Sequence, residues 1–219
     1  MNICIVTGSR ADLGLLHYPT KLLQEDSYFQ GQILNLWGCS FEQAYVNAAG
    51  AFAAERPDMI LVLGDRFEIL AAVTAAHLQR IPIAHIGGGD VTLGSYDDAM
   101  RDCISRMATI HFATSFSATA RLVGLGYCNV HLVGNPAVDY IRHADWRRLR
   151  PIEEPYVVVS YQAETIDDTV DVEAVTAAIG GRRAVWIAPN PDRGSERIPA
   201  TESYSHDAFL TLLYYCTEF

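Results

Sequence analysis

Residues 59–90, MILVLGDRFEILAAVTAAHLQRIPIAHIGGGD, decide the fold class. Two apolar runs, Met59–Leu63 and 81–86, flank the segment Phe67–Leu78, whose apolar residues recur with helical spacing. Continuous apolar strands joined by a helix of about 10 to 15 residues are typical of a parallel sheet that is covered on both faces. The stretch therefore predicts a strand, a helix and a second strand, with polar residues directly after each strand.

The same alternation extends to both sides of this stretch. Further strands are expected at 3–6, 33–37, 110–113 and 130–133, and further helices at 13–23, 41–54, 97–107 and 117–125. We therefore predict an α/β fold with a doubly wound parallel sheet, Rossmann-like, over residues 1–143. The segment ADWRRLRPIEEP, residues 144–155, breaks the pattern and is interpreted as a linker. The pattern then restarts, with strands at 156–160 and 184–188 and helices at 171–179 and 207–215, which predicts a partial second Rossmann-like domain over residues 156–219.

Composition narrows the classes of function. The chain has 219 residues, half of them hydrophobic, and a formal net charge of −10, so we expect a globular protein that binds neither nucleic acid nor anionic membranes. No apolar stretch is long enough to cross a membrane, and the N-terminus lacks the pattern of a signal peptide. The five cysteines show no zinc-binding spacing, which predicts reduced thiols in the core, no metal site and a cytoplasmic location.

The segment after the first strand reads TGSRADLG, residues 7–14. Its glycines would let a ligand approach the backbone, Arg10 could bind a phosphate, and the following helix would direct its N-terminus at an anion. The segment matches neither G-x-G-x-x-G nor a Walker loop, so a dinucleotide cofactor is disfavoured. The alternative is a tight turn from strand to helix, with Asp12 near the helix start.

Acidic residues also occur directly after the predicted strand Met59–Leu63 and at the start of the predicted helix over 97–107. Asp65, at the end of the strand Met59–Leu63, is placed either for acid–base chemistry or to cap the next helix, and Arg66 and Glu68 could form an ion pair beside it. Asp98 begins a later helix with Arg101 one turn further along, an arrangement that could be catalytic or could stabilise the helix end.

The segment His85-Ile86-Gly87-Gly88-Gly89-Asp90 ends another strand. Three consecutive glycines are costly in conformational entropy unless a ligand or another backbone comes close. His85, on an otherwise apolar strand, is either a core histidine or a substrate contact. In the second domain the polar loop PNPDRGS, residues 189–195, follows a strand and is either a binding loop or a simple turn.

In their order along the chain, the segments TGSRADLG, LGDRFE, IPIAHIGGGDVT, DDAMR, GNPAVD and PNPDRGS resemble the hydrolysing UDP-N-acetylglucosamine 2-epimerase family. The resemblance is to the branch that supplies N-acetylmannosamine or a related sugar for sialic and legionaminic acid synthesis. It implies a two-domain fold of glycosyltransferase-B type that binds a UDP-sugar between the domains. It also implies proton removal at C2, elimination of UDP to a glycal and addition of water, without a cofactor.

The resemblance assigns roles residue by residue. Asp65 matches a catalytic aspartate of the family, Asp98 matches an acidic residue on the helix of Arg101, and Arg10 matches a substrate-binding arginine. The expected catalytic carboxylates are Asp65, Asp98 and Asp90. The expected substrate-binding residues are Arg10, Asp12, His85, Arg101, Gln162, Asn190 and Asp192.

Three departures from the family pattern leave alternatives open. Gly87 occupies the position of a glutamate in many members, for which Asp90 could substitute, and Gln162 occupies the position of a histidine. The chain stops at Phe219, where the family would continue into a loop that binds the UDP phosphates. The alternatives are a catalytically silent binding or assembly protein and a glycosyltransferase of the same architecture. An exposed sheet edge and the apolar residues of 209–215 further predict a homo-oligomer.

Overall fold

The structure is a computed structural model that describes residues 1–147, 151–164, 166, 170–189, 194–199 and 203–217, without the side chain of Arg10. It divides into two compact units. The first unit comprises Met1–Thr92 and Asp97–Arg142, and the second comprises Leu93–Tyr96 and His143–Phe219. The predicted boundaries at residues 143 and 155 stay predictions, and each unit is described by itself.

The first unit is built on a parallel sheet of six strands in the order β2-β1-β3-β4-β5-β6. The strands are β1 (Asn2–Thr7), β2 (Gln30–Asn35), β3 (Met59–Leu63), β4 (Ile83–Ile86), β5 (Ile110–Ala113) and β6 (Val130–Leu132). The chain adds β2 on one side of β1 and all later strands on the other. This order confirms the predicted doubly wound sheet, and it places a topological switch point between β1 and β3.

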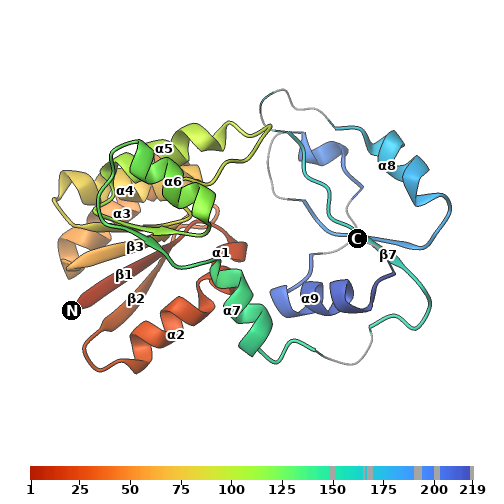
Figure 1. The fold of residues 1–219 in the computed structure, drawn as a ribbon, viewed down its shortest axis with the longest axis horizontal. Helices are drawn as coiled ribbons and strands as arrows, with labels where there is room; N and C mark the ends of the chain where they lie inside the picture. The colour runs from red at the N-terminus through yellow and green to blue at the C-terminus, as the bar shows by residue number, and fades with distance from the viewer. Residues whose placement is uncertain (148–150, 165, 167–169, 190–193, 200–202, 218–219) are drawn as a thin grey trace. The chain divides into compact units, whose positions relative to one another are not determined.

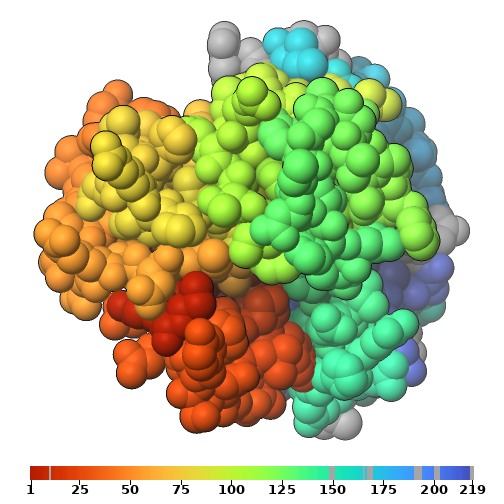
Figure 2. Space-filling view, turned by 60° about the vertical axis from the view of Figure 1, so that its left-hand side comes forward, coloured from red at the N-terminus to blue at the C-terminus, as the bar shows by residue number. Residues whose placement is uncertain are grey.

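Helices cover both faces of this sheet (Figure 1). They are α1 (Arg10–Leu15), α2 (His17–Glu25), α3 (Phe41–Glu55), α4 (Phe67–Leu78), α5 (Asp97–Met107), α6 (Phe116–Gly124) and α7 (Pro136–His143). Val6 and Val62 of the sheet pack with Phe52 of α3 on one face, while Ile5 packs with Leu16 on the other. In the space-filling view of Figure 2, the yellow end of α4 adjoins the yellow-green α5 on the surface of this unit.

Two helical segments differ from the prediction. The single helix expected over 13–23 is two helices, α1 and α2, that meet at Leu16. Pro19 explains the break. In one continuous helix its ring would collide with the carbonyl of Leu15, and its backbone nitrogen carries no hydrogen that could be donated to that carbonyl. Helix α7 was not predicted, although Asn135-Pro136 is a helix-start signal: the Asn135 side chain accepts a bond from the Ala137 amide at 2.9 Å.

The second unit contains a parallel pair of strands, β7 (Val157–Val159) and β8 (Ala184–Trp186), joined through α8 (Val172–Ile179). A short 3-10 helix, Ser195–Arg197, and α9 (His206–Tyr215) follow. The buried core of the unit combines Tyr156 and Val158 with Leu212 of α9, and the Tyr156 hydroxyl donates to the Leu212 carbonyl at 2.9 Å.

The packing of α9 corrects one expectation. Leu212, expected on a surface for self-association, is only 2% exposed and lies in the core of the second unit. Phe209, Leu213 and Tyr215 pack against the same core, while Tyr214 is exposed. The apolar side of α9 is therefore used inside the unit.

Two further observations concern the linker and the cysteines. Trp146, in the segment expected to be a linker, is buried, and its carbonyl accepts a bond from the Thr211 hydroxyl at 2.6 Å. All five cysteines are free, but Cys103 and Cys128 are exposed, so the expectation that they lie in the core was wrong for these two.

Among the described residues no helix is both long and apolar enough to span a membrane.

Candidate active site

Arg101 joins two predicted catalytic carboxylates at the carboxyl end of the sheet. Gly64, with a φ of 78°, turns the chain after β3 and places Asp65 before α4. Arg101 and Asp98 lie at the start of α5. The guanidinium forms ion pairs with Asp65 through Nη2 and with Asp98 through Nη1, the latter at 2.8 Å. The structure therefore brings Asp65 together with the predicted pair of Asp98 and Arg101.

Thr92 completes this cluster. Its hydroxyl accepts a bond from Arg101 Nη2 at 3.2 Å, and its amide lies 3.1 Å from both carboxylate oxygens of Asp98. The Arg101 side chain is 8% exposed, and its buried Nε has no hydrogen-bond partner among the described residues. Asp65 keeps 20% of its side-chain surface exposed. A partly exposed carboxylate in a fixed orientation is suited to accept a proton from a bound substrate.

Asp90 is held at the neighbouring strand ends. It follows β4 and the three glycines, and both of its carboxylate oxygens lie within hydrogen-bond distance of the Thr114 hydroxyl, at 2.7 and 2.8 Å. Thr114 directly follows β5. Asp90 therefore lies at the same edge of the sheet as Asp65, since the carboxyl ends of parallel strands share one edge.

The glycines before Asp90 are explained by packing within the protein. A Cβ on Gly88 would lie 2.8 Å from the Ser105 hydroxyl, and one on Gly89 would lie 2.5 Å from the carbonyl oxygen of Ala118. Gly89 also has a φ of 80°, which side chains disfavour. Of the two alternatives, a close ligand or a close backbone, the structure supports the backbone for Gly89.

His85 lies beneath this edge of the sheet and is fully buried. Its Nε2 is 2.8 Å from the Gly64 carbonyl, and its Nδ1 is 3.1 Å from the Ser105 hydroxyl. Burial lowers the pKa of His85 to about 4, so the ring is neutral near pH 7. This geometry supports the alternative of a core histidine, because the ring presents no exposed atom to a substrate.

The turn after β1 is organised by Asp12. Its carboxylate accepts bonds from the amides of Gly8 and Ser9 at 2.7 and 2.9 Å and from the Ser9 hydroxyl at 2.9 Å, as part of a capping box. Burial raises the pKa of Asp12, and the bonds from Gly8 and Ser9 oppose that shift. Asp12 therefore holds the turn together, and the side chain of Arg10 lies outside the described part of the chain.

The predicted ion pair of Arg66 and Glu68 is confirmed, with contacts of 3.1 and 3.2 Å to a buried Glu68. A Cβ on Gly8 would lie 3.3 Å from the Cβ of Glu68, so the turn after β1 packs closely on the start of α4. The turns after β1 and β3 thus meet at the switch point of the sheet. Open α/β sheets bind their ligands at this position.

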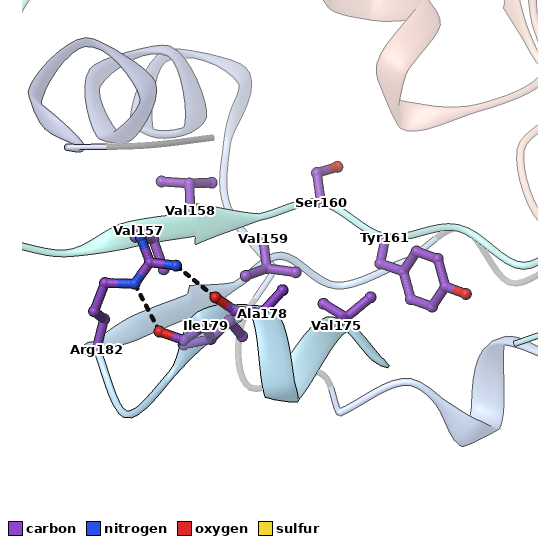
Figure 3. Close-up of a pocket in the computed structure, with 9 residues that line it drawn as sticks. All are labelled: Val157, Val158, Val159, Ser160, Tyr161, Val175, Ala178, Ile179 and Arg182. Atoms are coloured by element: carbon purple, nitrogen blue, oxygen red, sulfur yellow. Dashed lines mark hydrogen bonds between the residues drawn. The ribbon is translucent and has the colours of Figure 1, made fainter. Parts of the chain in front are cut away.

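Three of the predicted substrate-binding residues belong to the second unit. Gln162 is exposed in the coil after β7, and Asn190 and Asp192 lie outside the described residues. A pocket of about 330 Å³ lies between β7 and α8 (Figure 3). Val159 and Val175 lie on the pocket side, whereas Val158 points to the opposite side of the strand. Its lining is mostly apolar and includes none of the predicted site residues.

Among the residues that the structure describes, no group of three or more histidine, cysteine, aspartate or glutamate side chains is arranged to hold a metal ion. Thr92, Ser105 and Thr114 were not among the site residues predicted from the sequence. The position of Thr114 directly after a predicted strand could have revealed it, whereas Ser105 carries no local signal.

Comparisons with known proteins point in one direction. The family described as UDP-N-acetylglucosamine 2-epimerase matches residues 37–216. The GDP/UDP-N,N'-diacetylbacillosamine 2-epimerase (hydrolyzing) of Campylobacter jejuni is 33% identical over 117 residues, which are 52% of this chain and 30% of the relative. The UDP-N-acetylglucosamine 2-epimerase of Neisseria meningitidis is 28% identical over 169 residues, 70% of this chain and 45% of the relative. The chain thus spans less than half the length of both relatives.

Solved structures agree on the fold. The UDP-GlcNAc 2-epimerase of Neisseria meningitidis bound to UDP-GlcNAc superposes with a TM-score of 0.80 at 15% identity, covering 99% of this chain and 76% of that one. MnaA of S. aureus in complex with UDP also gives 0.80 at 15% identity, covering 98% and 72%. The expected fold class, a doubly wound α/β fold of glycosyltransferase-B type, is confirmed.

Proposed function

The chain belongs to the UDP-N-acetylglucosamine 2-epimerase family, and on that premise we propose that it is a hydrolysing 2-epimerase of a UDP-sugar. In the proposed reaction a base removes the proton at C2 and the bond between C1 and the UDP oxygen breaks. The resulting glycal carries a double bond between C1 and C2. Water then adds, with hydroxyl at C1 and a proton at C2, which releases N-acetylmannosamine or a related sugar beside UDP.

The observation that carries this proposal is the pairing of Asp65 and Asp98 through Arg101 at the switch point of the sheet. We assign Asp65 as the base at C2 and Asp98 or Asp90 as the acid. Arg101 orients both carboxylates of its cluster through its ion pairs, and its positive charge favours the binding of a negatively charged substrate nearby. Arg10, Gln162, Asn190 and Asp192 remain proposed substrate contacts on the strength of the family resemblance.

The experiment supplies UDP-N-acetylglucosamine and, separately, UDP-N,N'-diacetylbacillosamine in deuterated water. The expected result is release of UDP together with a 2-epimerised sugar that carries deuterium at C2. Asp65→Asn should reduce this activity by at least 100-fold, in the range seen when a general base is lost. Asp102→Asn, which removes an exposed carboxylate from the same helix α5, is the matched control and should leave the activity unchanged. Unlabelled and unconverted substrate with both sugars would contradict the proposal.

A second candidate function, a binding protein without catalysis, is favoured by Gln162. This side chain cannot exchange a proton near neutral pH, although it occupies the position at which the family resemblance places a histidine. Titration calorimetry with UDP separates the two candidates when it is combined with the labelling assay. Binding without labelling would support the second candidate.

We also propose that the protein works in the cytoplasm as a homo-oligomer. Five free cysteines support a reducing compartment. Exposed large apolar side chains near β2 and α3, including Trp37, Phe41 and Val46, support self-association. Light scattering tests the assembly, and a monodisperse monomer at micromolar concentration would contradict it.

A further inference from the structure

Gly64 directly follows β3, and residues of β4 bind both of its backbone polar groups. The Gly64 amide donates to the Ile86 carbonyl at 3.0 Å, and the Gly64 carbonyl lies 2.8 Å from Nε2 of His85. The φ of 78° at this residue sets the direction in which Asp65 leaves the strand. The position of Asp65 therefore depends on the side chain of His85 as well as on its own ion pair.

His85 is in turn held by helix α5. Its Nδ1 lies 3.1 Å from the hydroxyl of Ser105, which is buried one turn after Arg101. Helix α5 thus reaches Asp65 by two routes. Arg101 binds the carboxylate directly, and Ser105 acts through His85 and Gly64 on the backbone.

The hydrogen bonds define one tautomer of the His85 ring. A carbonyl oxygen can only accept, so Nε2 of His85 carries the hydrogen that is donated to Gly64. Nδ1 is then the acceptor for the Ser105 hydroxyl. Burial keeps the ring neutral, and the ring packs so closely on Gly88 that a Cβ at that position would lie 3.0 Å from Nδ1.

We propose that His85 and Ser105 form a brace that positions Asp65 through the backbone of Gly64, without either side chain contacting the substrate. Both are positioning residues. The inference rests on the proposed function, because Asp65 is there the base at C2. It also differs from the expectation that His85 contacts the substrate directly.

His111 provides a matched control for this brace. It occupies the position beside His85 on the neighbouring strand β5, is likewise buried, and its pKa is lowered by burial. Its ring packs on Tyr127 with a centroid distance of 4.9 Å, and its Nδ1 has no partner among the described residues. Loss of His111 therefore perturbs the same layer of the core without releasing Gly64.

The kinetic test compares His85→Gln, Ser105→Ala and His111→Gln in the labelling assay. We expect kcat to fall about 10- to 100-fold in His85→Gln, with a smaller fall in Ser105→Ala and little change in KM for either variant, because misplacement of a catalytic group acts on the chemical step. The double variant should be no worse than His85→Gln alone, since both substitutions break one chain of contacts. An equal fall in kcat for His111→Gln would overturn the proposal.

A second measurement does not depend on activity. Hydrogen exchange of the Gly64 amide should accelerate about 10-fold in His85→Gln and in Ser105→Ala, and it should stay unchanged in His111→Gln. Unchanged exchange in Ser105→Ala and His85→Gln would refute the brace. Accelerated exchange in a protein whose wild type shows no labelling would refute the proposed function and support the brace, so the two failures are distinguishable.

Discussion

Replacing Gly89 by alanine tests whether the glycine run serves the protein's own packing. The new Cβ would lie 2.5 Å from the Ala118 carbonyl oxygen and 2.9 Å from Cγ of Leu122, far closer than such atoms normally approach. Because α6 is fixed on the sheet by Ala118 and Leu122, the overlap can be relieved only by moving the helix or the loop. Overpacking of this kind costs about 1–3 kcal/mol, and the positive φ adds about 1–2 kcal/mol.

Gly126→Ala is the control for the backbone term. Gly126 has a φ of 83°, similar to the 80° of Gly89, but a Cβ there would meet no atom within 4 Å. Both variants therefore incur the cost of a positive φ, and only Gly89→Ala incurs the overlap. We expect Gly89→Ala to lose about 2–5 kcal/mol and Gly126→Ala about 1–2 kcal/mol in the free energy of unfolding.

The assay is urea denaturation at pH 7, followed by circular dichroism, with calorimetric titration of UDP on each folded variant. Equal losses of stability in the two variants would refute the packing argument. If in addition only Gly89→Ala lost UDP binding, the glycine would be required by a ligand instead.

Three further predictions concern stability and reactivity. Burial lowers the pKa of His85 to about 4, whereas in the unfolded chain this histidine takes up a proton near pH 6.5. The free energy of unfolding should therefore fall by about 2 kcal/mol between pH 7 and pH 5. Burial also lowers the pKa of His111, which adds to the loss of stability at low pH. His85→Gln should remove the His85 part of this pH dependence, and an unchanged dependence in urea titrations would contradict the prediction. Burial raises the pKa of Cys4 to about 11, so a maleimide at pH 7.5 should label exposed Cys103 in the folded protein and Cys4 only in urea, as mass spectrometry of peptides would show. Ser40→Ala removes a capping box from α3 and should cost about 1 kcal/mol by thermal denaturation, and a neutral result would contradict that role.

The elements near the site followed closely from the sequence. Strand β3 and helices α4 and α5 have the predicted bounds, because their apolar residues are continuous in the strand and helically spaced in the helices. The break between α1 and α2 required the position of Pro19 to be weighed against an apolar pattern that continues across it. Asp65 was identified because it follows a strand, a local feature.

The partners of the site residues could not be predicted in this way. Arg101 reaches Asp65 across 36 positions of the chain, and His85 reaches Gly64 and Ser105 across 21 and 20. Each of these pairs depends on which strands are neighbours and on the side of the sheet that each helix covers. Thr114 and Ser105 have no sequence pattern that reveals their partners.

The sequence by itself determined the alternation of strands and helices and the parallel sheet. It also placed Asp65 and Asp90 after strands and Asp98 at the start of a helix, because hydrophobic periodicity and turn residues are local properties. Only the tertiary structure decided between alternatives that local pattern left equal. It placed Asp12 in a helix cap, buried His85 beneath the sheet edge and showed that Gly89 makes room for a carbonyl of α6. The physical reason is that burial, hydrogen-bond partners and close contacts are properties of residues that the fold brings together from distant parts of the chain.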